Sequence, residues 1–183
     1  TTALEDPTTL VVRTGATFRA HQAVEVSMPW RLQVPGPAND RVSRDGDAMR
    51  LGSFFPILPW EPGLGWATEA PAGGFAEASS APTADFDLTV TVPEGFNVLA
   101  SGTPDPSRPG RYTAAAMRDV AVSVGRFQTL SAVAMAPNPV QVTVGVHRGV
   151  TDAGAGYLDT AVRSLQDFGR RFGAYPWSTF TLS

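Results

Sequence analysis

Most of the chain alternates apolar and polar residues with a period of two, which predicts β-strands with one buried face. The clearest case is 85–92, in which four apolar residues alternate with Asp and Thr. Gly and Pro separate this stretch from its neighbours, as expected for turns between short strands. Weaker forms of the pattern predict further strands at 10–13, 16–19, 23–34, 111–116, 120–127, 129–135 and 140–147.

A turn sequence follows the clearest strand. Residues 93–95 read Pro-Glu-Gly, and 96–100 is again mostly apolar. A short turn between two strand patterns is typical of a β-hairpin. We therefore expect 96–100 to return beside 85–92.

The segment 49–77 combines aromatic residues with prolines. Proline cannot donate a hydrogen bond to a sheet ladder, so this segment is predicted to be irregular and to cross a packed surface. Its aromatic residues, at 54–66, are interpreted as packing residues, since aromatic side chains usually become buried. A ligand-facing role is the alternative.

The period changes near the end of the chain. From 152 to 172 apolar residues recur every three or four positions, which predicts an amphipathic helix. Thr151 or Asp152 can cap its start, Gly173 can end it in a left-handed conformation, and 178–182 reads as a strand. The predicted fold is mainly β: an antiparallel β-sandwich or saddle-like domain followed by one amphipathic helix and a strand, with a domain change near residue 138.

Composition excludes several classes of protein. The net charge is −3 and no basic cluster is present, which argues against nucleic-acid binding. The absence of cysteine excludes disulfides and thiolate metal sites. No apolar stretch reaches the ~18 residues of a membrane span, so we expect a soluble protein. Neither an initiator Met nor a signal peptide precedes Thr1, and both ends are interpreted as cuts, which leaves the cellular location open.

Candidate chemical groups are few. His147 has no nearby Asp, Glu or His at metal-ligand spacing, and both His21 and His147 are interpreted as ordinary surface or edge histidines. Asp85 and Asp87 share a strand face about 6.6 Å apart, a separation that suits glycoside hydrolysis or calcium binding. We interpret them instead as a solvated face. The residues alone therefore assign no catalytic, metal or cofactor site.

Three segments together resemble one family. Residues 84–102 are similar to a strand pair in the N-terminal β domain of aminopeptidase N-like zinc metallopeptidases, and 121–127 to that domain's last strands. The helix whose end reads Phe172-Gly173-Ala174-Tyr175-Pro176-Trp177 resembles the first helix of the family's thermolysin-like catalytic domain. The resemblance implies an N-terminal β domain at 1–138, incomplete at its start, and the beginning of a catalytic domain at 139–183.

The departures from the family pattern define the expected function. The H-E-x-x-H zinc motif and the G-x-M-E-N strand are both absent, and the latter is expected shortly after Ser183. The resemblance thus implies a non-catalytic fragment, inactive by itself, whose parent enzyme binds zinc and a peptide substrate. In the parent this β domain would flank the active-site cleft. Glu61 is the candidate for holding the substrate's amine, with Glu69 and Glu77 nearby.

Two further expectations concern partners. One face of the 152–172 helix is expected to pack on the missing catalytic domain of the same polypeptide, so the fragment should dimerise through that face or be poorly stable. The alternative function is a stand-alone β-sandwich module that binds carbohydrate or protein through the 54–66 aromatic residues.

Overall fold

The computed structural model describes residues 2–6, 9–37, 40–67 and 81–183, with side chains from residue 9 onward. The chain divides into two compact units, which are described separately. The smaller unit comprises Thr1–Leu32 and Pro56–Pro82, and the larger comprises Gln33–Phe55 and Thr83–Ser183. No helix in the described residues is long and apolar enough to cross a membrane.

The smaller unit contains two short antiparallel hairpins. One joins β1 (Thr2–Asp6) to β2 (Thr9–Val12), and the other joins β5 (Trp60–Glu61) to β6 (Gly65–Trp66). The strands predicted at 16–19 and 23–34 are wrong, because residues 13–34 contain no strand. Their alternation suits a half-buried strand, but a strand forms only beside a partner with which it can pair.

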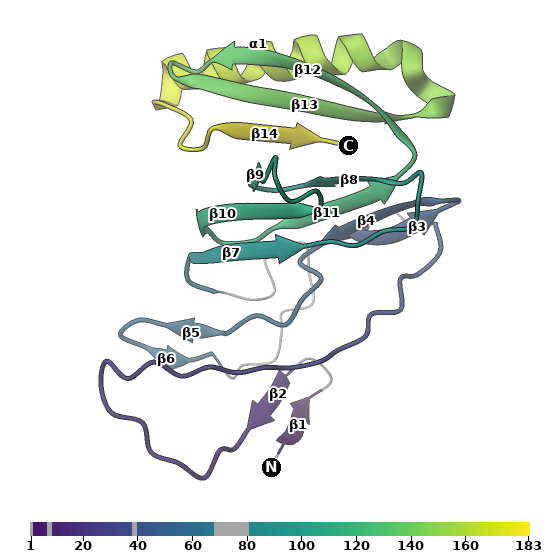
Figure 1. Ribbon diagram of the computed structural model, residues 1–183. Coiled ribbons are helices and arrows are strands. Elements are labelled where there is room, and N and C mark those ends of the chain that lie inside the picture. The colour runs from purple at the N-terminus through teal and green to yellow at the C-terminus, as the bar shows by residue number, and fades with distance from the viewer. Residues whose placement is uncertain (1, 7–8, 38–39, 68–80) are drawn as a thin grey trace. The chain divides into compact units, whose positions relative to one another are not determined.

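Two antiparallel sheets form a β-sandwich in the larger unit, as predicted (Figure 1). The first sandwich sheet has the order β3-β4-β11-β8 and the second has the order β7-β10-β9. Their shared core contains buried Ala100, Val122 and Val124. The strand bounds are Val42–Asp45 (β3), Ala48–Gly52 (β4), Ala84–Thr89 (β7), Asn97–Ala100 (β8), Thr103–Pro104 (β9), Arg111–Met117 (β10) and Ala121–Gly125 (β11).

The hairpin predicted between 85–92 and 96–100 is wrong, although both strands exist. β7 pairs with β10, whereas β8 pairs with β11 in the other sheet. The turn closed by the Phe96 N–H on the Pro93 carbonyl therefore carries the chain across the sandwich. Leu88 and Val98 consequently pack in one core from opposite sheets.

A third sheet carries the only helix of more than two turns in the described residues. It consists of β12 (Phe127–Met135), β13 (Pro139–His147) and β14 (Thr179–Leu182), and α1 (Gly154–Phe172) runs along one face. β12 and β13 are antiparallel, whereas β13 and β14 are parallel. A parallel pair needs a crossover, which α1 supplies. We call this sheet the helix-covered sheet.

The core of the helix-covered sheet is the most completely buried part of the described chain. Val140, Val142 and Val144 on β13 are at most 1% exposed, and Ala161 and Leu165 of α1 pack against them. The chain's own sheet covers the Ala161 and Leu165 part of the helix's apolar stripe, because the crossover lays the helix on it. Phe168 and Phe172, the last apolar residues of that stripe, are 56% and 81% exposed, so a missing neighbour stays a prediction for this end of the helix.

The ends of α1 differ from the predicted caps. Neither Thr151 nor Asp152 caps α1; both lie in the 3₁₀ helix η1 (Arg148–Ala153), which His147 caps by accepting from the Gly149 N–H. Gly173 does end the helix, with φ 102° and ψ 176°, a conformation that requires glycine but is not the left-handed helical one. The domain change predicted near residue 138 falls inside the β12–β13 hairpin.

Candidate functional site

A cavity of about 780 Å³ lies beside β14, between the helix-covered sheet and the sandwich. Its walls come from β8, the following turn, β10, β14 and the loop before β14. Most of the lining residues are Ala, Gly, Ser or Thr, with Tyr175 and Trp177 as the large aromatic residues of the loop. The cavity is therefore lined mainly by small side chains.

The loop between α1 and β14 fixes one end of the cavity. The Tyr175 N–H donates to the Ala136 carbonyl at 2.9 Å, and the Tyr175 ring packs edge-on against Trp177 and Phe180. The Trp177 Nε1–H donates to the Ala115 carbonyl of β10 at 3.2 Å. The loop thus ties the helix-covered sheet to the sandwich.

Hydroxyl groups make the other contacts across the cavity. Thr179 Oγ1 donates to the Gly102 carbonyl at 2.9 Å, and Ser123 Oγ lies 2.6 Å from Ser183 Oγ. Gly102 has φ +93°, and a Cβ there would collide with the Thr113 carbonyl. Only glycine therefore lets the turn between β8 and β9 approach β10 this closely.

The chemistry available in the lining is limited. Asp85 is the only charged side chain among the described lining residues, and its Oδ1 accepts from the Ala116 N–H at 2.9 Å. Burial raises the pKa of Tyr175 above its ordinary value. The cavity therefore offers hydroxyl and backbone groups for binding, and its described lining contains no acid–base pair of the kind used in general catalysis.

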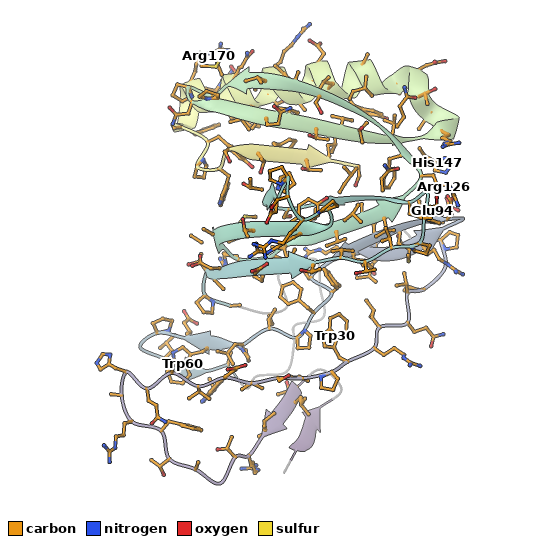
Figure 2. The ribbon with its side chains drawn as sticks, in the orientation of Figure 1. Trp30, Trp60, Glu94, Arg126, His147 and Arg170 are labelled. Carbon is orange, nitrogen blue, oxygen red and sulfur yellow. The ribbon has the colours of Figure 1, made fainter. Side chains whose placement is uncertain are left out.

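A second cavity, of about 540 Å³, lies on the other side of Ser123 and Ser183 and includes His147 in its lining. His147 Nε2 lies 3.5 Å from Asp47 Oδ1, and Arg126 Nε lies 3.1 Å from Asp47 Oδ2. Figure 2 shows His147 and Arg126 at the same end of the sheets. The sequence did not reveal this contact, because the β3–β4 turn brings Asp47 from far along the chain.

Asp85 and Asp87 are both exposed, as the interpretation of a solvated face predicts, and Asp87 also takes part in an ion-pair network. Arg111 Nη2 lies 2.6 Å from Asp87 Oδ2, and Arg111 Nη1 lies 3.1 Å from Asp105 Oδ2. The Arg111 hydrogen bond lowers the pKa of Asp87 below its ordinary value. Hydrogen bonds from Ser107, followed by Arg111, lower the pKa of Asp105 to about 2. Arg111 of β10 thus forms ion pairs with Asp87 of β7 and with Asp105, which follows β9.

Glu61 lies on β5 in the smaller unit and is exposed. No described residue lies within hydrogen-bonding or ion-pair distance of its carboxylate. Trp60 pairs with Trp66 across the hairpin, their rings edge-to-face at 5.0 Å, and the two side chains are 40% and 57% exposed. The predicted neighbours Glu69 and Glu77 lie outside the described residues.

The aromatic segment therefore divides into two parts. Phe54 and Phe55 are half-buried, and Phe55 packs edge-to-face on Phe86 of β7. They are packing residues, as predicted. Trp60 and Trp66 are instead largely exposed on the hairpin, and the ligand-facing alternative stays a prediction for them.

Zinc does not fit the described residues. No group of three His, Cys, Asp or Glu side chains in the described ranges could hold a metal ion. No family model, curated protein or solved structure matches the chain. The resemblance to metallopeptidases consequently depends on the sequence segments named above and on the order of the elements they form.

Proposed function

We propose that these residues form the non-catalytic β-rich portion of a zinc-dependent metallopeptidase of the aminopeptidase type, and that they flank the active-site cleft of the parent enzyme. The observation that carries the proposal is the order of elements from β11 to β14. A sandwich strand runs directly into the helix-covered sheet, and a crossover helix then ends in Gly173-Ala174-Tyr175-Pro176-Trp177 before a parallel strand.

The role of that loop supports the proposal. Tyr175 and Trp177, two residues of the family-like sequence, contact the end of β12 and β10 respectively. The resemblance implies a helix that ends in this sequence and leads into a strand, and α1 and β14 are arranged in that way. Zinc and the catalytic groups belong, in this proposal, to residues of the parent outside the 183.

Activity measurements test the proposal in two steps. The 183-residue chain, with and without added zinc, should not hydrolyse fluorogenic aminoacyl substrates. The polypeptide encoded by the complete gene should contain zinc and hydrolyse them, and a chelator should abolish its turnover. Zinc-dependent turnover by the 183-residue chain, or a complete protein without zinc and without peptidase activity, would contradict the proposal.

Glu61 is proposed as the residue that holds the substrate's amine in the parent enzyme. A charge-assisted hydrogen bond from a free amino group is worth about 1.5–3 kcal/mol. Glu61→Gln in the complete enzyme should therefore raise KM by about tenfold or more. Glu25→Gln, a second exposed carboxylate of the smaller unit, is the matched control and should leave KM unchanged. Equal effects of the two substitutions would remove Glu61 from this role.

The second candidate function is a binding module for carbohydrate or protein. The exposed pair of Trp60 and Trp66 favours it, because exposed aromatic rings are common at recognition surfaces. Calorimetric titration with soluble oligosaccharides tests the carbohydrate form. Saturable binding by the wild type that Trp66→Ala abolishes would favour the carbohydrate form of this candidate, and heat signals unaffected by Trp66→Ala would eliminate that form.

A further inference from the structure

Hydroxyl side chains supply most of the polar lining of the 780 Å³ cavity beside β14. Eight of its described lining residues are serine or threonine. The cavity's volume falls within the range of about 300–1,000 Å³ that is typical of small-molecule sites. The described lining contains no Lys, Arg or His, so it offers no side chain that would neutralise an anion. An apolar ligand also fits poorly, because it would take water from the hydroxyl groups without replacing their hydrogen bonds.

Two pairs of these hydroxyl groups keep hydrogen-bonding capacity for a ligand. Thr103 Oγ1 lies 3.5 Å from Ser178 Oγ, and Ser123 Oγ lies 2.6 Å from Ser183 Oγ. Either oxygen of each pair can be the donor. Since a hydroxyl has one proton and two lone pairs, each pair uses one proton and keeps another, together with further lone pairs. These groups therefore suit a ligand whose own polar groups both donate and accept, as hydroxyl groups do.

A bulge in β10 holds a carboxylate and an indole ring at the cavity wall. The pairing of β10 with β7 shifts register here, and Ala116 has φ +52°. Asp85 Oδ1 accepts from the Ala116 N–H at 2.9 Å. Trp177 Nε1–H donates at 3.2 Å to the Ala115 carbonyl, the other end of the same peptide group. The indole nitrogen and the carboxylate oxygen are therefore at most about 9 Å apart. Bulges and strained backbone of this kind are common beside functional sites.

The carboxylate and the aromatic rings suit a sugar better than they suit an organic cation. Asp85 is exposed, and no described residue donates to its Oδ2, which can accept from ligand hydroxyl groups. The half-buried rings of Tyr175 and Trp177 supply apolar surface on which the C–H groups of a sugar ring can pack. A cation would use the carboxylate and the rings but not the hydroxyl pairs, and an exposed ion pair contributes little.

We propose that this cavity binds a neutral mono- or disaccharide. Asp85 Oδ2 accepts from sugar hydroxyl groups, and the pair of Thr103 and Ser178 exchanges hydrogen bonds with others. The Trp177 ring packs against the C–H groups of the sugar. The ligand thus contacts side chains from β7, from β9 and from the loop before β14.

Calorimetric titration of the 183-residue chain with glucose, galactose, mannose, maltose, cellobiose and lactose tests the proposal. At least one of these sugars should bind saturably at one site per chain. Asp85→Asn keeps an acceptor for the Ala116 N–H but removes the charged acceptor for the ligand, and should raise the dissociation constant by about tenfold or more. Thr103→Val removes one hydroxyl at nearly constant volume and should raise it by about threefold to tenfold. Circular dichroism should show that both variants remain folded.

Asp152→Asn and Thr129→Val are the matched controls, because both residues are exposed and line neither of the two cavities described above. They should leave the dissociation constant unchanged. Trp66→Ala should also leave it unchanged, since Trp66 belongs to the hairpin of the smaller unit.

A wild type that binds none of the six sugars would overturn the proposal. Binding that survives both Asp85→Asn and Thr103→Val, or that Trp66→Ala or a control substitution abolishes, would also overturn it. None of these measurements requires peptidase activity, so a negative result here leaves the proposed metallopeptidase function untouched.

Discussion

At the scale of single residues, Gly102 controls how closely the turn between β8 and β9 approaches β10. A Cβ at this position would meet the Thr113 carbonyl and would also force an alanine to adopt φ +93°. Gly102→Ala should therefore lower the free energy of unfolding by about 1–3 kcal/mol. Urea denaturation followed by circular dichroism measures the change.

Gly156 provides the control for this substitution. It lies on the exposed side of α1 with nothing within 4 Å of an added Cβ. Gly156→Ala should raise the free energy of unfolding by about 0.5–1 kcal/mol, since alanine favours helix. If the two substitutions change stability in the same direction, the close approach at Gly102 is not what restricts that position.

Asp105 should make the stability of the chain depend on acid pH. Its pKa is about 2 in the folded protein against 3.8 ordinarily, mainly because Ser107 and Arg111 hydrogen-bond the ionised form. A depressed pKa stabilises the fold above about pH 4, and this contribution is lost as the pH falls toward 2. Thermal melting from pH 5 to 2 should show a shallower decline for Asp105→Asn. Asp159→Asn, which changes the net charge equally, should retain the wild-type slope.

At the scale of elements, local sequence pattern identified the strands well and their partners poorly. The strands predicted at 111–116, 129–135 and 140–147 are confirmed as β10, β12 and β13. The alternation in 23–34 is as regular as theirs but forms no strand. Pairing depends on contacts between residues distant in sequence, which a local period does not contain.

Only some of the apolar residues in the amphipathic pattern of α1 are buried in the core. Leu165 is 6% exposed in the core, whereas Phe172, the last residue of α1, is 81% exposed. Leu165→Ala should therefore lower the free energy of unfolding by about 2–5 kcal/mol. Phe172→Ala should change it by about 0.5 kcal/mol or less. Chemical denaturation of the two variants compares their free energies of unfolding, and similar losses would mean that the Phe172 ring is buried in the folded chain.

At the scale of the whole molecule, the cavity beside β14 could not be predicted from the sequence. The family-like loop was recognisable from Tyr175 and Trp177, but its partners Ala115 and Ala136 are ordinary alanines that contribute only carbonyl groups. No side-chain pattern marks a backbone acceptor. The cavity depends in addition on Gly102, whose role follows from a close approach that exists only after folding.

The two units should differ strongly in hydrogen exchange. Every described residue that is buried lies in the larger unit, whereas large apolar side chains of the smaller unit, such as Val26, Trp30 and Leu64, are 47–82% exposed. Local stability follows buried apolar contact. Amides of 13–32 and 56–67 should therefore exchange within about seconds, and those of 140–146 only through near-global unfolding. Mass spectrometry of peptides from these ranges measures the rates. Comparable protection in both units would show that the smaller unit has a buried core of its own.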